Sequence, residues 1–269
     1  MQSSSKSPAP RAAAFFDLDK TLMAGSSAMP FARAARQRGL VGRRQLARWG
    51  VDHLRYRLRG ASDEETGQVI DAAREMLADV PVKEIERMVP ELMAGILPLV
   101  YPQMLDEVHE HQDAGRPTVI VSAAGSGIVE SVAQALGMDG GIGTKYAIGP
   151  GGNFTGELDG PFVYGLGKVT AIKQFAAASD IDLASSYAYS DSVSDLPMLR
   201  AVGNAVVVNP DSALMAVAKV EGWRVLRFEK LGRRLAIIGA TALAAAVGGG
   251  AGVATRRHQS GRKRRPLAR

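Results

Sequence analysis

The sequence predicts an α/β protein: a Rossmann-like parallel sheet flanked by helices, with a helical cap inserted after the first strand. Three observations support this prediction. An apolar run at residues 12–16 has the length of a short buried strand. A long region with helical spacing then extends to about residue 98. From residue 101 to residue 228, apolar strands alternate with amphipathic helices, which is typical of βαβ units on a parallel sheet.

Length and composition exclude several classes of protein. The chain has 269 residues, enough for a core domain and a subdomain. It contains no Cys, which excludes disulfides, thiolate metal sites and a Cys nucleophile. His109 and His111 lie two positions apart on a predicted helix and therefore point to different faces. We expect both to be ordinary surface or half-buried residues, and we do not expect a zinc enzyme.

The chain divides into four parts by composition. Residues 1–11 are rich in Ser and Pro and lack the apolar core of a signal peptide, so we expect a disordered leader on a cytoplasmic protein. Residues 12–22 and 99–229 form the predicted core, and residues 23–98 form the helical cap. Residues 230–269 hold an Ala/Gly-rich apolar segment and a basic tail.

The positive charge of the chain is concentrated in that last part. The net charge is +6, and residues 230–269 hold ten of the 33 Lys and Arg and no acid, which leaves the body net acidic. Residues 235–254 carry no charge and are long enough for a membrane span, but they are mostly Ala and Gly. Two interpretations stay open: a membrane-associated helix or shallow anchor, and a soluble or disordered tail.

The predicted cap follows a Gly, Ser and Pro segment at residues 24–30, and its front half is rich in Arg. Ser62 and Glu65 form a capping box, which is the sequence signature of a helix N-terminus. Apolar residues at helical spacing follow, and a second amphipathic stretch covers residues 85–93. The cap is therefore predicted to be helical.

In the core, Gly and Pro mark where elements begin and end. A helix opens at Pro102 and stops at Gly115, with Pro117 just beyond. The other predicted elements are strand 118–122, helix 128–136, a short strand near 144–148, a Gly-rich hairpin around 151–153, a helix from Lys168, strand 187–190, helix 196–199, strand 205–208, helix 213–220 and strand 224–228.

Polar residues fall where such a fold gathers ligands. Asp17, Ser122 and Asp191 each close an apolar strand, and Lys168 starts a helix. Because ligands bind at the carboxyl ends of the strands in open parallel sheets, we expect these side chains to converge on one edge.

The residue types at this edge suit attack on phosphorus. Asp17 is the candidate nucleophile, and Asp19 could act as general acid and base. Ser122 offers a hydroxyl to a phosphoryl oxygen, and Lys168 offers a positive charge to the same group. In-line attack on phosphorus depends chiefly on positioning and charge neutralisation, which these groups would supply.

Magnesium is the cofactor that this arrangement predicts. Mg²⁺ prefers octahedral oxygen ligation and keeps several waters, so two carboxylates and a backbone carbonyl suffice to hold it. Asp17 and Asp191 supply the carboxylates, and Asp195, one helical turn on, could hold the ion's water shell.

Four motifs occur in order and together resemble those of the haloacid dehalogenase (HAD) superfamily of phosphohydrolases. They are FFDLDKTL at residues 15–22, VIVS at residues 119–122, the pair Gly167-Lys168, and YSDSVSDL at residues 189–196. A helical insert between the first and second motifs is similar to subclass IB, the phosphoserine-phosphatase-like group.

The resemblance implies an aspartyl-phosphate intermediate on Asp17, with Asp19 protonating the leaving group and then activating water. It also implies that the backbone carbonyl of Asp19 ligates Mg²⁺ and that Thr21 contacts the phosphate. One departure concerns the substrate. Phosphoserine-selective members carry a Glu soon after the first motif to hold the substrate amine, whereas residues 23–27 contain no acid. Phosphoserine is therefore in doubt as the substrate.

We predict a Mg²⁺-dependent phosphomonoester hydrolase that acts on a small phosphorylated metabolite. One alternative is a membrane-associated phosphatase of a lipid-derived phosphate, attached to the anionic inner face of the membrane by its basic tail. Another is a phosphomutase. A nucleic-acid-binding module is disfavoured, because the tail has little aromatic interleaving and the body is net acidic.

Overall fold

The computed structural model describes residues 11–42, 74 and 77–228. Residues up to Arg227 belong to one compact unit, and a second begins at Phe228. Several sequence predictions lie outside the described residues. They concern the leader, the capping box of Ser62 and Glu65, the apolar segment 235–254 and the basic tail.

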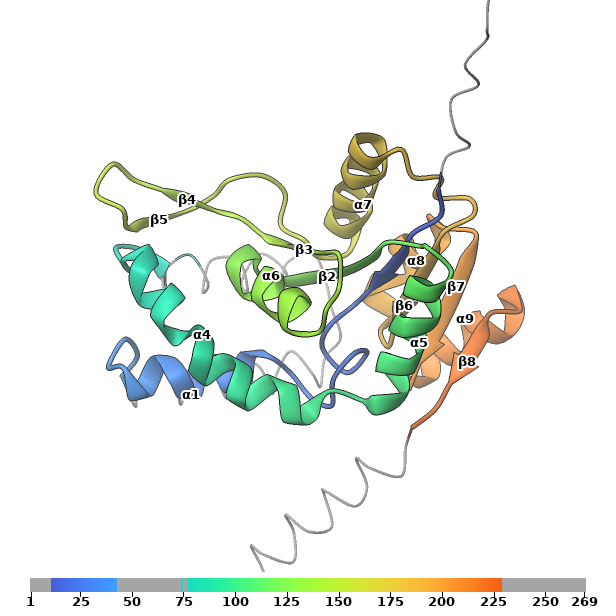
Figure 1. Cartoon of the computed structure of the whole chain (residues 1–269), viewed down its shortest axis with the longest axis horizontal. Helices are drawn as coiled ribbons and strands as arrows, with labels where there is room; N and C mark the ends of the chain where they lie inside the picture. The colour runs from blue at the N-terminus through green and yellow to red at the C-terminus, as the bar shows by residue number, and fades with distance from the viewer. Residues whose placement is uncertain (1–10, 43–73, 75–76, 229–269) are drawn as a thin grey trace, which may run out of the picture. The chain divides into compact units, whose positions relative to one another are not determined.

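A six-stranded parallel sheet forms the core, in the order β3-β2-β1-β6-β7-β8 (Figure 1). The strands are β1 (Ala14–Phe16), β2 (Thr118–Gly125), β3 (Gly140–Thr144), β6 (Tyr187–Ser190), β7 (Asn204–Val208) and β8 (Arg224–Leu226). The short strand β1 pairs on both sides, with Phe16 opposite Ile120 on β2 and Tyr189 on β6. The predicted α/β fold with a parallel sheet flanked by helices is therefore confirmed.

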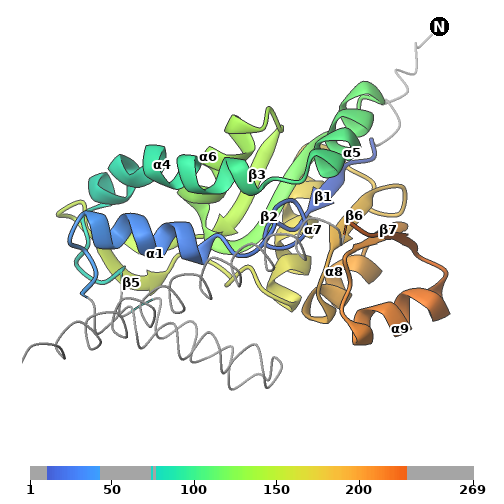
Figure 2. The same ribbon diagram turned by 90° about the horizontal axis from the view of Figure 1, so that it is seen from below.

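Helices cover both faces of the sheet. They are α5 (Pro102–Asp113), α6 (Ser126–Ala135), α7 (Leu166–Ser179), α8 (Leu196–Arg200) and α9 (Ser212–Glu221). Figure 2 shows α5 and α6 on one side of the sheet and α8 and α9 on the other. Side chains alternate across β1 accordingly: Phe15 joins the apolar cluster with α7, α8 and α9, and the ring of Phe16 meets His111 of α5.

One strand was not predicted, and its composition explains why. The sequence indicated a strand near residues 144–148, but the chain breaks there into β3, which ends at Thr144, and β4 (Tyr146–Ile148). Strand β3 is rich in Gly because it lies against the backbone of α6. A Cβ atom at Gly141 would lie 2.8 Å from the backbone of Val129, and one at Gly143 would lie 2.7 Å from the Cα atom of Ser126. Close packing thus overrides the low strand propensity of Gly.

The described part of the cap contains α1 (Ala28–Gln37), α4 (Val82–Ile96) and the short 3₁₀ helix η1 (Leu97–Leu99). Ala34 and Ala35 of α1 pack with Met88 and Leu92 of α4, and Ile128 of α6 joins this cluster. The cap therefore shares an apolar contact with a helix of the core.

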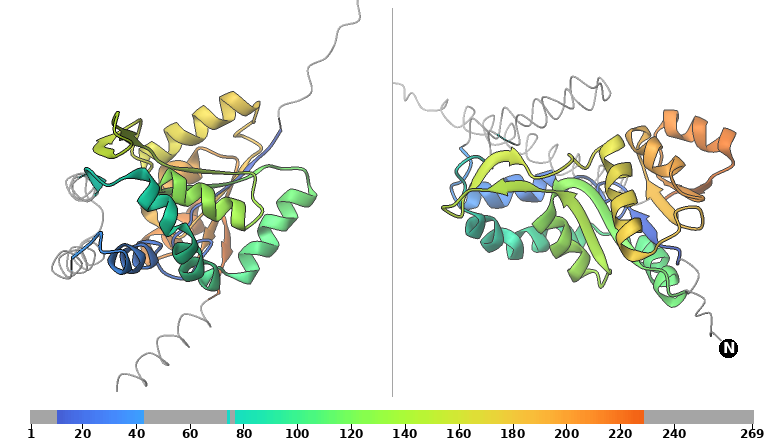
Figure 3. Two further views of the ribbon diagram at one scale, coloured as in Figure 1. Left: turned by 60° about the vertical axis from the view of Figure 1, so that its left-hand side comes forward. Right: turned by 90° about the horizontal axis from the view of Figure 1, so that it is seen from above.

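A hairpin from the core also reaches the cap. Strands β4 and β5 (Phe154–Leu158) are antiparallel, and both Figure 1 and Figure 3 show them beside α4. The Asp79 N–H donates to the Phe154 oxygen at 2.9 Å, and the Phe154 N–H donates to the Val80 oxygen at 2.9 Å. The chain before α4 thus adds a short stretch of antiparallel pairing to the hairpin.

Within residues 11–42 and 77–228, no helix is long and apolar enough to cross a membrane.

Candidate active site

The predicted polar residues lie at the carboxyl edge of the sheet. Asp17 directly follows β1, and its N–H donates to the Tyr189 oxygen of β6 at 3.0 Å. Asp191 directly follows β6, and Ser122 lies buried on β2. Since β1 pairs in parallel with both β2 and β6, the three residues come from adjacent strands at one edge.

Lys168 connects two of the buried carboxylates. Helix α7 begins at Leu166, which places Lys168 in its first turn. The Lys168 Nζ donates to Asp17 Oδ1 at 2.6 Å and to Asp195 Oδ2 at 2.7 Å. Asp195 Oδ2 also accepts from the Ser190 hydroxyl at 2.7 Å. Asp195 therefore fixes the ammonium group of Lys168, while its predicted role in holding the water shell of Mg²⁺ stays a prediction.

Steric crowding explains why the residue before Lys168 is Gly. A Cβ atom at Gly167 would lie 1.8 Å from the backbone oxygen of Phe162. No side chain fits there unless the loop before α7 moves, so the first turn of α7 packs directly on that loop.

Burial and mutual repulsion raise the pKa values of the site carboxyls. Burial raises the pKa of Asp17 to about 7, with the charges of Asp195 and Asp191 adding to the rise and Lys168 opposing it. Burial likewise raises the pKa of Asp191 to about 6, with Lys20 opposing the rise. Burial disfavours the charge on Lys168, but Asp17 and Asp195 outweigh it and raise the pKa of that ammonium group. The positive charges of Lys168 and Lys20 thus do not offset the effects that raise the pKa values of Asp17 and Asp191.

Two buried oxygens point to missing partners. Thr21 Oγ1 and Asp195 Oδ1 are buried without a hydrogen-bond partner in the described protein. Buried polar atoms normally have a hydrogen-bond partner, so these two oxygens suit the binding of an added polar group. A divalent cation fits the carboxylates of Asp17 and Asp191, because its charge would offset the burial and the carboxylate repulsion that raise their pKa values. Among the described residues, no three His, Asp or Glu side chains gather as a metal site, so a cation held by Asp17 and Asp191 would need a backbone carbonyl or water as further ligands.

Asp19 is fixed by the start of the cap, which the sequence did not indicate. Its Oδ1 accepts from the Ser27 N–H at 2.9 Å, and its Oδ2 accepts from the Ser26 hydroxyl at 2.7 Å. Lys20 adopts a positive φ of 59°, and its Nζ lies 3.7 Å from Asp191 Oδ2. A Ser pair directly before a helix is the signal that could have drawn attention to this segment.

His111 corrects a sequence prediction. It was expected at the surface or half-buried, yet only 3% of it is exposed, because it lies on the inward face of α5. Its Nε2 lies 2.8 Å from the Tyr189 hydroxyl, and its Nδ1 accepts from Arg116 Nε at 2.7 Å. Burial, together with Arg116 and Arg224, lowers the pKa of His111 to about 4. The imidazole is therefore neutral near pH 7.

A hydrogen-bonded network continues from His111 through Tyr189 to Glu107 and Arg224. The Tyr189 hydroxyl donates to Glu107 Oε2 at 2.9 Å, and Arg224 donates to both oxygens of Glu107. The Tyr189 ring stacks on Phe16, with 4.4 Å between ring centroids. The residue before Asp17 therefore packs on a fixed aromatic ring.

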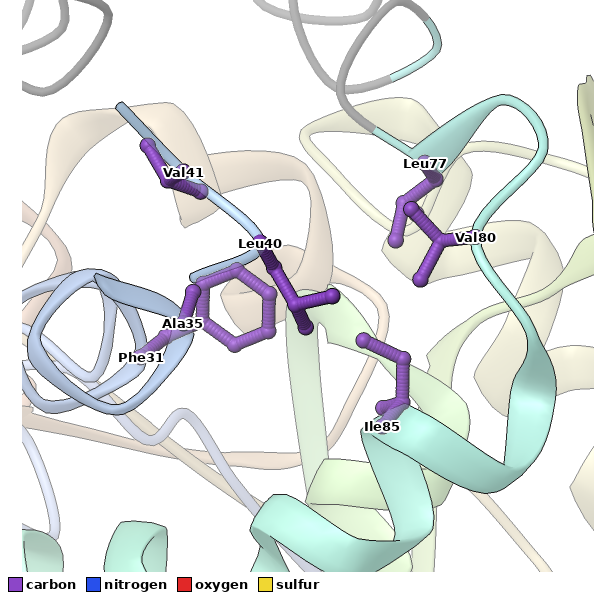
Figure 4. A pocket seen from close by; sticks show the side chains of 7 residues that line it. All are labelled: Phe31, Ala35, Leu40, Val41, Leu77, Val80 and Ile85. Carbon is purple, nitrogen blue, oxygen red and sulfur yellow. The ribbon is translucent and has the colours of Figure 1, made fainter. Parts of the chain in front are cut away.

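A hollow within the cap lies between α1 and the start of α4 (Figure 4). It is lined by Phe31, Ala35, Leu40, Val41, Leu77, Val80 and Ile85. These side chains offer no charge or hydrogen-bond donor, so they cannot bind a phosphate group.

A known protein family matches most of the chain. A family profile for haloacid dehalogenase-like hydrolases matches residues 14–200, which include all four motifs. The chain belongs to this family. The match extends from β1 through the cap to α8, so it includes every candidate site residue.

Relatives of this HAD-family chain carry phosphatase names. A probable phosphatase of Mycobacterium tuberculosis is 39% identical over 224 residues, which cover 83% of this chain and 77% of the relative. A phosphoserine phosphatase of the same species is 34% identical over 253 residues, covering 91% and 81%. A histidinol-phosphatase of Neisseria meningitidis is 33% identical over 220 residues, covering 80% and 98%. The chain is an enzyme of the HAD hydrolase family, and these relatives are named as phosphatases.

Solved structures show the same fold. A Bordetella pertussis protein of unknown function is 30% identical, with a TM-score of 0.71, covering 81% of this chain and 98% of that one. A substrate-bound phosphoserine phosphatase has a TM-score of 0.55 at 17% identity, covering 84% and 97%. The second likeness concerns the fold alone.

Proposed function

We propose that this HAD-family hydrolase is a Mg²⁺-dependent phosphatase of small phosphomonoesters, with Asp17 as the nucleophile. The observation that carries the proposal is the buried contact of Asp17 with Lys168, beside Asp191, at the carboxyl edge of the sheet. HAD phosphatases generally use Mg²⁺, and the fit of Asp17 and Asp191 to a cation supports that cofactor here.

In the first step, a carboxylate oxygen of Asp17 attacks phosphorus and the bond from phosphorus to the alcohol oxygen breaks. Asp19 gives its proton to the departing alcohol. Lys168, Ser122 and Thr21 bind the phosphoryl oxygens, and the orphan hydroxyl of Thr21 then gains a partner.

In the second step, water attacks the phosphorus of the aspartyl phosphate. Asp19 takes the proton of this water, and the bond from phosphorus to Asp17 breaks, which releases phosphate and restores both carboxyls. Mg²⁺, when bound, neutralises the charge that develops on the phosphoryl group. Asp195 keeps the Lys168 ammonium aimed at Asp17 throughout.

Asp17→Asn tests the nucleophile. The variant should lose hydrolysis of p-nitrophenyl phosphate by at least about 10³-fold, because an amide oxygen does not replace the carboxylate nucleophile. Circular dichroism should show that it is folded. Asp113→Asn, at the exposed end of α5, is the matched control and should keep full activity. Chelation should inactivate the wild-type enzyme and added Mg²⁺ should restore it.

Full activity of Asp17→Asn would disprove the nucleophile, and indifference to chelators would disprove the metal. The choice of substrate is a separate question, because the named relatives act on different phosphate esters. The membrane-associated and phosphomutase alternatives stay sequence predictions. The membrane-associated alternative depends on residues 235–269, which lie outside the described part of the chain. The expectation that a cytoplasmic protein lies at the inner face of the membrane depends on the same residues.

A further inference from the structure

Tyr189 contacts the chain at the proposed nucleophile in two ways. Its backbone oxygen accepts from the Asp17 N–H at 3.0 Å. Its ring stacks on the ring of Phe16, with 4.4 Å between ring centroids and 10° between the ring planes. Strand β1 ends at Phe16, so both contacts lie where the chain leaves the sheet toward the site. The position of Tyr189 therefore bears directly on the position of Asp17.

The strand that carries Tyr189 also leads to other residues of the site. The next residue, Ser190, donates its hydroxyl hydrogen to Asp195 Oδ2 at 2.7 Å. Asp191, the proposed magnesium ligand, directly follows this strand. A shift of Tyr189 would therefore disturb Asp17, Asp191 and Asp195 together.

The hydroxyl end of Tyr189 lies in the network on the α5 side of the sheet. The hydroxyl donates to Glu107 Oε2 at 2.9 Å, and the His111 Nε2 lies 2.8 Å from the same hydroxyl oxygen. Arg224 of β8 donates to Glu107 Oε2 at 2.8 Å and to Oε1 at 2.7 Å, which fixes the carboxylate in turn. Tyr189 is only 1% exposed, so these side chains and not bulk water satisfy its hydroxyl.

One arrangement of hydrogen atoms fits all of these contacts. Arg116 Nε donates to His111 Nδ1 at 2.7 Å, so the hydrogen of the neutral imidazole lies on Nε2 and points to the Tyr189 hydroxyl. Burial and the charge of Glu107 raise the pKa of Tyr189, so the hydroxyl keeps the hydrogen that it donates to Glu107. The hydrogen bonds thus run in one direction, from Arg116 to Glu107, and hold the hydroxyl from two sides.

We propose that Tyr189 is a positioning residue for catalysis, and that the hydrogen bonds of its hydroxyl to Glu107 and His111 hold Asp17 where it attacks phosphorus. The network acts through the ring and the backbone of Tyr189, which contact Phe16 and Asp17. This inference rests on the proposed phosphatase activity and adds a group of residues outside the four sequence motifs to the catalytic arrangement.

Tyr189→Phe tests the hydroxyl, because it keeps the ring that stacks on Phe16. We expect kcat for p-nitrophenyl phosphate to fall about tenfold, since a ring that is no longer held lets the nucleophile move from its attacking position. KM should change less than about twofold, because the proposed phosphate ligands Lys168 and Ser122 lie on α7 and β2. Steady-state kinetics on protein that circular dichroism shows to be folded measures both constants.

Variants of Glu107 test the same hydrogen bond from its other side. Glu107→Leu removes the acceptor and should lower kcat by a similar factor, whereas Glu107→Gln keeps an acceptor oxygen and should recover most of the activity. Glu107→Leu should cause no further loss when it is combined with Tyr189→Phe, because both changes break one and the same hydrogen bond.

Thr118→Val is the matched control. The Thr118 hydroxyl also donates to a carboxylate, Asp139 Oδ2, at 3.0 Å, and Thr118 is fully buried. It is the first residue of β2, at the end of the strand away from the site. This variant should lower the melting temperature and leave kcat and KM unchanged.

The outcomes separate positioning from support of the fold. Lower melting temperatures with unchanged kcat in Tyr189→Phe and Glu107→Leu would refute the proposal, and so would losses that multiply in the combined variant. If Tyr189→Phe does not fold, the two Glu107 variants decide, and equal kcat values for Glu107→Leu and Glu107→Gln would refute it. A wild type that does not hydrolyse p-nitrophenyl phosphate would refute the proposed function itself.

Discussion

The two carboxylates of the first motif differ in what surrounds them. Asp17 is buried against a single ammonium group, whereas Asp19 accepts two hydrogen bonds from the beginning of the cap. A nucleophile needs a cation nearby, and a proton donor needs a fixed direction toward the leaving oxygen. These different surroundings suit the two roles proposed for Asp17 and Asp19.

Ser26→Ala should weaken the proton donor selectively. With one of its two hydrogen bonds gone, Asp19 is less well directed, and kcat/KM for an alkyl phosphate should fall about tenfold. The fall for p-nitrophenyl phosphate should be smaller, because nitrophenolate leaves without a proton. Comparing the two substrates by steady-state kinetics checks this.

The control for this prediction is Ser131→Ala, since the Ser131 hydroxyl donates within α6 to the Gly127 oxygen. It should change neither substrate. An equal loss of both substrates in Ser26→Ala would mean that Ser26 supports the fold and does not direct Asp19.

At the scale of elements, the first turn of α7 determines where Lys168 lies. The backbone of this turn packs on the loop before it, with space at Gly167 for a hydrogen atom and nothing larger. The close packing of α7 on the preceding loop therefore explains Gly167 of the third motif. The buried carboxylates of Asp17 and Asp195 explain the positive charge of Lys168.

Gly167→Ala should displace the start of α7 and with it Lys168. We expect kcat for p-nitrophenyl phosphate to fall at least about 100-fold, because a misplacement of about 1 Å at a catalytic group can cost that much. Gly127→Ala on α6, where an added methyl group meets nothing within 4 Å, should leave kcat unchanged and keep or raise the melting temperature. A fully active Gly167→Ala would show that the loop adapts and that the glycine is not required.

The elements and the site were predictable to different degrees. Asp17, Asp191 and the start of α7 could be placed because each adjoins an apolar run, and parallel pairing brings such ends to one edge. Strand β3 was missed because its residues are chosen for close contact with α6 and carry little strand signal. The contact of Asp19 with Ser26 depends on a turn with positive φ at Lys20 and Gly25, which no pattern of apolar residues reports.

For the whole molecule, the concentration of carboxyls in the site affects stability. Burial raises the pKa of Asp17 in the folded protein to about 7, above its ordinary value of 3.8. Between these values the native state binds more protons than the unfolded state, so this group makes folding less favourable as the pH rises from about 4 to 7. His111 acts in the opposite direction, because its pKa of about 4 lies below 6.5 and stability is lost as the pH falls through that range.

Asp17→Asn separates these two contributions. In EDTA, the melting temperature of the variant relative to wild type should increase as the pH rises from 4 to 7, since the His111 contribution is common to both proteins. Added Mg²⁺ should raise the wild-type melting temperature more at pH 7.5 than at pH 5, and should raise that of the variant less. Thermal denaturation across this range measures both. A difference that does not vary with pH would contradict the raised pKa of Asp17.

Strand β1 has a consequence for how the enzyme is made. Its hydrogen bonds reach far along the chain: Ala13 bonds to Ser186 across 173 positions, and Asp17 meets Lys168 across 151. On the ribosome, β1 emerges before β6 and is enclosed on both sides only after β6 has been made. A nascent chain that ends within α7 contains Asp17 and Lys168 but not β6, the strand that pairs with β1. The proposed catalytic groups can therefore be assembled only after synthesis has passed β6, and until then β1 lacks one of its two neighbouring strands.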